Sequence, residues 1–342
     1  MLKKIIISTL LIPFLTGCTT SQKNLGEKAE APLVKYMNTI TESELQTHIS
    51  VIASDEMQGR DTGSEGQKKA GRYLIEQYKK LGLSYPPGAD SFYQTVPSSY
   101  MKKAWSPNLP DSENIWVYFE GGEKKDELIV ISAHYDHIGM KNDEIYNGAD
   151  DNGSGTSALL EIADAFVQAK QAGYTPKRSI LFLHVTGEEY GLHGSRYYTA
   201  NPILPLENTV ANINIDMIGR RGEGKENNDN YVYVIGSDRL STDLHKLSEK
   251  ANEYVQLELD YTYNDLNDPN RFYYRSDHYN FARKGVPAIF YFDGVHEDYH
   301  QTTDTSDKID FPLYAKRTKL AFATAWQLVN AENRPMIDKD GK

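Results

Sequence analysis

Apolar positions follow two different periods along this chain, and together these periods predict an ordered series of strands and helices. Continuous apolar runs such as 129–131 and 180–183 are typical of strands that are buried on both faces. Strands are predicted at 114–119, 127–133, 179–185, 209–215, 231–235 and 286–292, with the first two paired across a Gly121-Gly122 turn. Helices are predicted to run from the Thr41 and Ser64 capping residues to about 53 and 81, and at 154–170, 192–200, 239–254 and 312–331.

The order of these elements predicts the fold class. Strands alternate with helices from residue 127 onward, and this order is typical of a mostly parallel central sheet covered by helices on both faces. We therefore expect one α/β domain over residues 35–335.

The first 34 residues do not fit this pattern. Lys3 and Lys4 precede a short apolar stretch at 5–15 that is followed by Leu15-Thr16-Gly17-Cys18. This arrangement resembles a bacterial lipoprotein signal, and Cys18 is the single cysteine of the chain. We predict a signal peptide at 1–17, lipidated Cys18 and a flexible tether at 18–34, and an exported protein that is anchored in the outer membrane facing the periplasm, or at the cell surface. An ordinary signal peptide with an incidental cysteine is the alternative.

The composition indicates which kinds of binding partner to expect. The chain has 342 residues and a formal net charge of -11, and 39% of its residues are hydrophobic. This length and composition are ordinary for a globular protein with a sizeable core. A nucleic-acid partner is not expected, because phosphate binding requires a basic surface. We expect a monomer.

Polar residues gather where the predicted strands end. Ligands of open α/β sheets bind at the carboxyl ends of the strands, so side chains that follow different strands converge there. Histidine and carboxylate groups of this kind are the usual ligands of zinc. They are His134, Asp136 and His137; Asp150 and Asp151; Glu188 and Glu189; Asp216; and His296, Asp298 and His300.

Each of these residues also has an ordinary structural interpretation. His134 and His300 could be loop histidines, the Glu188-Glu189 pair could be a solvated surface, and Asp150 and Asp151 could simply cap a helix. The joint pattern favours a cation, because a carboxylate cluster at one sheet edge would otherwise repel itself.

Five segments carry a specific resemblance. The sequences HYDH at 134–137, GADDNGSG at 148–155, GEEYGLHGS at 187–195, IDMIG at 215–219 and DYHQTTDT at 298–305 resemble those of the zinc aminopeptidases of metallopeptidase family twenty-eight. The region 53–83 resembles the N-terminal region of the same family, so the resemblance covers roughly 43–330. It implies a zinc-exopeptidase fold, without the accessory domain that the family often inserts before HYDH.

The resemblance also implies a role for each matching residue. Two Zn²⁺ ions would be held by His134, Asp151, Glu189, Asp216 and His300, with Asp151 as the bridge and a cis Asp151–Asn152 peptide bond. Glu188 would be the general base, Asp136 would orient the His134 ring by accepting its N–H, and Tyr299 would bind the tetrahedral intermediate. The substrates would be peptides with a free N-terminus.

The sequence does not decide the roles of several other residues. His137 lies outside the implied ligand set and is interpreted as a supporting or loop histidine, and His184 is interpreted as a core histidine. Asp277 could support the site. The segment 261–274 could be a specificity wall or a surface loop. Arg220 and Arg221 are most simply solvated, although with Arg275 they could bind a substrate carboxylate.

The sequence leaves four functions in competition. They are a di-zinc aminopeptidase, a carboxypeptidase or deacylase of the same family, a glutaminyl cyclase that uses one zinc, and a non-enzymatic binding member. The complete ligand set and the Glu188-Glu189 pair favour the aminopeptidase. A lipoprotein that served only as an adhesin or scaffold would need no metal.

Overall fold

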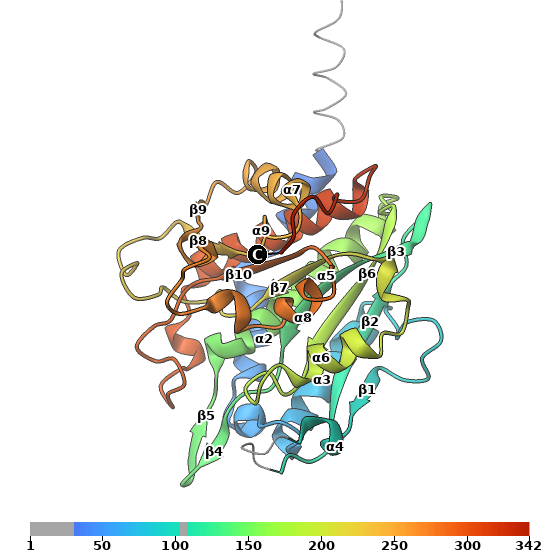
Figure 1. Cartoon of the computed structure of the whole chain (residues 1–342). Coiled ribbons are helices and arrows are strands. Elements are labelled where there is room, and N and C mark those ends of the chain that lie inside the picture. Colours follow the sequence, from blue (N-terminus) through green and yellow to red (C-terminus); the bar gives the residue numbers. More distant parts are fainter. Residues whose placement is uncertain (1–30, 103–107, 342) are drawn as a thin grey trace, which may run out of the picture.

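The computed structural model describes residues 31–102 and 108–341. An eight-stranded sheet crosses its centre in the order β1-β2-β6-β3-β7-β10-β8-β9, and helices cover both faces of the sheet (Figure 1). The strands are β1 (Tyr93–Val96), β2 (Ser112–Phe119), β3 (Lys124–His134), β6 (Arg178–Val185), β7 (Thr209–Ile215), β8 (Tyr231–Ile235), β9 (Glu258–Asp260) and β10 (Ala288–Phe292). A separate hairpin is formed by β4 (Gly139–Lys141) and β5 (Glu144–Tyr146).

The predicted mostly parallel sheet is confirmed at its centre, where β6, β3, β7 and β10 run parallel. Every residue of β6, β7 and β10 is buried, because helices lie on both faces of these strands. The sheet is mixed toward its edges, since β1 and β2 are antiparallel to their neighbours and β8 is antiparallel to β10.

The predicted pairing of the first two long strands is wrong. Strand β6 lies between β2 and β3 and pairs with both of them. The connection at Gly121 therefore crosses the start of β6, and a Cβ at Gly121 would lie 2.3 Å from the main-chain carbon of Arg178. Only glycine permits so close an approach. Gly121, which we interpreted as part of a hairpin turn, thus allows a third strand to enter.

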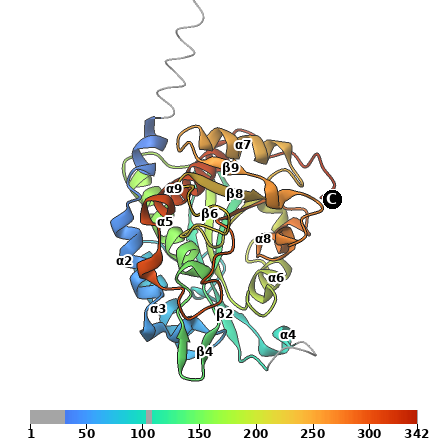
Figure 2. The ribbon, with the colours of Figure 1, turned by 90° about the vertical axis from the view of Figure 1, so that its left-hand side faces the viewer.

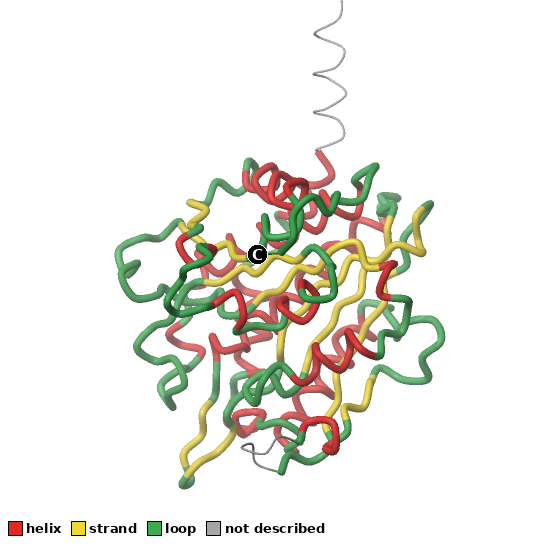
Figure 3. The backbone as a smooth tube through the Cα atoms, viewed as in Figure 1, coloured by secondary structure: helices red, strands yellow, loops and turns green. Residues whose placement is uncertain are grey.

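The helices form a layer on each face of the sheet (Figures 2 and 3). Helices α2 (Glu42–Ile52), α3 (Glu65–Lys80), α5 (Gly155–Gln171) and α9 (Phe311–Asn330) lie on one face, and α6 (His193–Ala200) and α8 (His278–Ala282) lie on the other. Helix α7 (Thr242–Asn252) packs on α9, and the short α4 (Ser98–Met101) packs on α6. The predicted caps are present, since Thr41 and Ser64 accept hydrogen bonds from the main-chain N–H groups of Glu44 and Gln67.

The folded region begins before residue 35, the boundary that we predicted. Residues 31–37 are helical and Leu33 is fully buried, so part of the predicted tether packs on the domain. The predicted signal peptide, Cys18 and residues 19–30 lie outside the described residues. Within the described residues, no helix combines the length and the apolar character needed to cross a membrane.

Candidate metal centre

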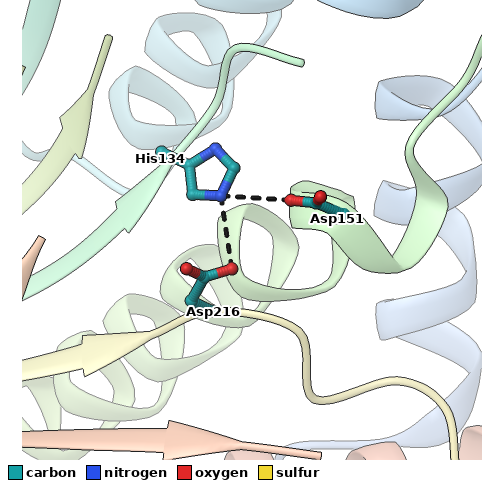
Figure 4. Close-up of side chains that lie close together, drawn as sticks. All are labelled: His134, Asp151 and Asp216. Atoms are coloured by element: carbon teal, nitrogen blue, oxygen red, sulfur yellow. Dashed lines mark hydrogen bonds and ion pairs between the residues drawn. The ribbon is translucent and has the colours of Figure 1, made fainter. Parts of the chain in front are cut away.

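A first ligand group lies where β3 and β7 end and α5 begins. His134 is the last residue of β3, Asp216 follows β7, and Asp151 lies in the segment η2 (Ala149–Ser154) that leads into α5. The Nε2 atom of His134 lies 3.2 Å from Asp151 Oδ1 and 3.2 Å from Asp216 Oδ1 (Figure 4). All three side chains are buried. The parallel strands thus bring together three residues that are far apart in the sequence.

A second ligand group forms on the other oxygen of Asp151. The Nε2 atom of His300 lies 3.1 Å from Asp151 Oδ2 and 3.2 Å from Glu189 Oε2. His300 has a left-handed main chain, with φ at 58°, in the loop that follows β10. The two oxygens of one carboxylate therefore face two separate groups of nitrogen and oxygen atoms.

The distances within both groups fit a zinc coordination sphere. Two ligand atoms held tetrahedrally at the usual zinc distance of about 2.0–2.1 Å lie roughly 3.3 Å from each other. The four distances from His134 and His300 to their carboxylate neighbours are between 3.1 and 3.2 Å. These separations are those expected between two ligand atoms of one tetrahedral zinc ion.

The charge of the site also favours a cation. Asp151, Glu189 and Asp216 converge here, and in the described part of the chain their recorded ion pairs are with histidines only. Buried carboxylates without a compensating cation are costly. Nitrogen and oxygen ligands of these types are those that zinc prefers.

Glu188 lies beside the first group and lines the same pocket as His134, Asp151 and Asp216. Burial raises the pKa of its carboxyl group well above the usual range, and the neighbouring Asp216 and Glu189 raise the pKa further, although His134 opposes the shift. A carboxylate that holds a proton more tightly than usual is suited to accept one during a reaction.

Asp136 contacts the His134 ring, as predicted, and does so through its main chain. The Nδ1 atom of His134 lies 3.1 Å from the main-chain carbonyl oxygen of Asp136, whereas the nearest carboxylate oxygen is 3.8 Å away. The carboxylate instead accepts hydrogen bonds from Thr62 Oγ1 at 2.8 Å and from the main-chain N–H of Glu188 at 3.3 Å. Asp136 therefore orients His134 through its carbonyl and holds the segment of the general-base candidate through its carboxylate.

Tyr299 lies over His300, with a distance of 3.8 Å between the ring centroids and an angle of 24° between the planes. Burial and the neighbouring Asp151, Glu189 and Glu188 raise the pKa of its hydroxyl group, so the hydroxyl keeps its proton and remains a donor. Tyr299 lines the same pocket as Glu188. The apolar part of this pocket is formed by Met217, Phe272, Phe290, Phe292 and Val295.

Three further candidates, His184, Arg220 and Arg221, are bound to other side chains of the protein. His184 is a core histidine as expected, since its Nε2 lies 2.8 Å from the hydroxyl of Tyr78 and burial lowers its pKa to about 3. Arg220 and Arg221 pair with Asp298 and Asp310, both at 2.7 Å. These two arginines are therefore already neutralised by the protein.

Two candidates lie closer to the pocket. Phe272 lines it, so the segment 261–274 contributes one residue to the wall, and the neighbouring Arg275 also lines it. Asp277 is fully buried and accepts a hydrogen bond from Ser195, and burial raises its pKa to about 7. His134, Asp216 and Asp136 are close enough to influence that pKa, which places Asp277 beside the first ligand group.

Three supporting residues were not predicted from the sequence. Arg60 is fully buried and donates to the carbonyl oxygens of Ile52, Tyr135, Asn147 and Gly148, which fastens the segment before Asp151. Asp304 accepts hydrogen bonds from the main-chain N–H groups of Asp150 and Asp151 at 3.1 Å. Ser276 Oγ donates to Asp216 Oδ2 at 2.6 Å. Arg60 and Asp304 lie inside segments that carry the resemblance, whereas Ser276 lies outside the quoted segments.

The fold and these two candidate ligand groups describe an α/β protein with a candidate metal centre at the carboxyl edge of its sheet. The model of peptidase family M28 matches residues 114–325, and the chain belongs to this family. The Asp151–Asn152 peptide bond is cis, as the family resemblance implied.

A relative with a similar sequence supports membership of this family. A probable leucine aminopeptidase of Trichophyton verrucosum is 30% identical over 215 residues, which cover 61% of this chain and 56% of the fungal protein. The chain thus spans little more than half of that relative's length.

Two solved structures share the fold. A zinc aminopeptidase from Bacillus subtilis superposes with a TM-score of 0.64 at 18% identity, over 88% of this chain and 98% of the bacterial one. A glutaminyl cyclase from Porphyromonas gingivalis superposes with a TM-score of 0.63 at 18% identity, over 83% of this chain and 97% of the cyclase. These similarities show that the fold is shared by a peptidase and a cyclase.

Proposed function

We propose that the chain is an aminopeptidase that uses two zinc ions. The observation that carries this proposal is the position of Asp151, whose Oδ1 faces His134 at 3.2 Å and whose Oδ2 faces His300 at 3.1 Å. One zinc would be held by His134, Asp151 and Asp216, and the other by Asp151, Glu189 and His300. Membership of a peptidase family and the names of its relatives support the same activity.

The residues around the two proposed ions have different roles in the reaction. Two bound zinc ions supply a water of lowered pKa and polarise the carbonyl group of the scissile bond. Glu188, whose pKa is raised, takes the proton of the attacking water and passes it to the leaving amine. The hydroxyl of Tyr299 donates a hydrogen bond to the oxygen on which negative charge develops. Glu188, the carboxylate of the pocket that is not a proposed zinc ligand, attracts the free α-amino group of the substrate.

The alternative functions receive less support. A carboxypeptidase needs free cationic groups for the terminal carboxylate, but Arg220 and Arg221 are bound to Asp298 and Asp310, which leaves Arg275. A glutaminyl cyclase would use one zinc, and the second group on Asp151 would then have no role. A non-enzymatic binding protein would have no use for Glu188 in the metal pocket.

Cleavage of aminoacyl-p-nitroanilides tests the proposed activity. A form that begins at residue 24 is assayed with free-amine substrates and with N-acetylated controls, before and after chelation and zinc re-addition. We expect cleavage of the free-amine substrates only, lost on chelation and restored by zinc. Equal cleavage of blocked substrates, or cyclisation of N-terminal glutamine without hydrolysis, would transfer the assignment to another activity of the same centre.

We also propose that the protein is exported and anchored to a membrane through lipidated Cys18. The support is the sequence alone, namely a basic start, a short apolar stretch and a cysteine that directly follows Leu15-Thr16-Gly17. The variant Cys18→Ser should move the full-length protein from the membrane fraction to the soluble fraction with its activity intact. Retention in the membrane fraction would refute the anchor.

A further inference from the structure

We propose that His137 is a positioning residue that determines which oxygen of Glu189 binds the second metal, an inference that rests on the proposed function. His137 Nδ1 lies 2.7 Å from Glu189 Oε1. The other oxygen, Oε2, lies 3.2 Å from His300 Nε2 and faces the second ligand group. The hydrogen bond from His137 thus reserves one oxygen and leaves the other for the metal.

The distances distinguish this role from that of a ligand. His137 can be grouped with Asp151 and Glu189, because one candidate ligand atom of each lies within 4.8 Å of the others. A shared zinc would however place ligand atoms roughly 3.3 Å apart, and a separation of 2.7 Å would need an angle at zinc of about 80°. His137 Nδ1 also lies 3.7 Å from Asp151 Oδ2, farther than the 3.1 Å of His300. His300 therefore has the ligand geometry, and His137 has the geometry of a hydrogen-bond donor.

The ring of His137 is held firmly enough to orient another side chain. It is fully buried, and its main-chain N–H donates to the carbonyl oxygen of Arg60 at 3.1 Å. Gly148 packs directly against the ring, since a Cβ at this position would lie 2.4 Å from His137 Cδ2. Because Arg60 also binds the carbonyl of Gly148, the histidine and the segment before Asp151 share one rigid support.

The same arrangement occurs at the first ligand group. Ser276 Oγ donates to Asp216 Oδ2, while Asp216 Oδ1 faces His134. The carboxylates of Asp216 and Glu189 therefore each have one oxygen restrained by a protein donor and one directed to a metal position. Removal of such a supporting donor typically lowers metal affinity about 10–100-fold.

Three variants of His137 test this role through zinc affinity, measured by competition with a chromophoric chelator. His137→Asn can place an amide donor near the position of Nδ1, whereas His137→Gln places its amide farther along the side chain and His137→Leu has no donor. We expect the Asn variant to bind both zinc ions within about 3-fold of the unmodified protein, and the Leu and Gln variants to lose about 10–100-fold affinity at one site only. A matched control is His184→Leu, at a buried histidine bonded to Tyr78, which should leave both affinities unchanged.

Several results would overturn the inference. Unchanged affinity in all three variants would remove any role for His137, and an Asn variant as weak as the Leu variant would make His137 itself a ligand. Equal weakening of both sites would indicate a general structural effect. If the Leu variant does not fold, the difference between the Asn and Gln variants decides the matter. A single zinc in the unmodified protein would refute the proposed function as well, whereas two zinc ions with unchanged variants would refute this inference alone.

Discussion

Ser276 Oγ donates a hydrogen bond to Asp216 Oδ2 at 2.6 Å, which directs the other oxygen of Asp216 toward His134. Ser276 in turn accepts a hydrogen bond from Asn214 Nδ2 at 2.8 Å, so the ligand is connected to β7 of the central sheet. The metal centre is therefore oriented by the sheet through a chain of buried polar groups.

The variant Ser276→Ala should weaken binding at the first zinc. Without the hydroxyl, Asp216 can rotate, and we expect about 10-fold lower affinity at one of the two sites. Chelator competition measures this loss. Ser248→Ala, the same change at a buried serine of α7, is the control and should leave both affinities unchanged. Equal affinities in the two variants would contradict the role of Ser276.

The variant Glu188→Gln should separate metal binding from turnover. Glutamine has the same shape but cannot take a proton, so we expect both zinc ions to remain and the turnover number to fall by a factor of about 10²–10⁴. Elemental analysis and steady-state kinetics on one preparation provide both values. Turnover near that of the unmodified protein would exclude Glu188 as the general base.

Arg60 should be essential for stability although its hydrogen bonds go to main-chain carbonyl groups rather than to the proposed ligand side chains. Its guanidinium group satisfies four main-chain carbonyl groups, and burial lowers its pKa to about 10. Arg60→Met removes these four hydrogen bonds, although the carbonyl of Gly148 keeps the one from the main-chain N–H of Gly153. We expect the free energy of unfolding in urea to fall by about 3 kcal/mol or more. Arg72→Met, at an exposed arginine paired with Glu65, should change it by less than about 1 kcal/mol. A similar effect for both variants would refute the anchoring role.

Removal of the metal should destabilise the fold. Zinc binds the native state selectively, so at a concentration about 1,000 times its dissociation constant it adds roughly 4 kcal/mol. Chelation should therefore lower the thermal midpoint by several degrees, and zinc should restore it where magnesium does not. A midpoint that is insensitive to chelation would mean that the native state does not depend on zinc.

The sequence predicted the central part of the fold because its signals there are local. The buried strands 178–185 and 209–215 are continuous apolar runs, and Ser64 is followed by a matching Gln67. The entry of β6 between β2 and β3 depends on a long-range contact at Gly121, which no local pattern encodes. Helix α7 begins at Thr242, later than predicted, because Ser241 provides its cap.

For the site as well, local signals could be predicted and long-range contacts could not. His134 and Asp216 could be predicted because they end buried strands that lie side by side in the sheet. The hydrogen-bond partners could not be predicted, because Ser276 and Asp304 reach the site from loops and Arg60 from the end of a short 3-10 helix, and none of these segments has a periodic sequence. The acceptor for His134 is also a main-chain carbonyl, which every residue has.

The central claim is that Asp151 bridges two zinc ions, and anomalous scattering at the zinc edge from a crystal of the zinc-loaded protein tests it most directly. We predict two peaks about 3.5–4 Å apart, one beside His134 and Asp216 and one beside Glu189 and His300. A single peak, or two peaks of which neither contacts Asp151, would contradict the account.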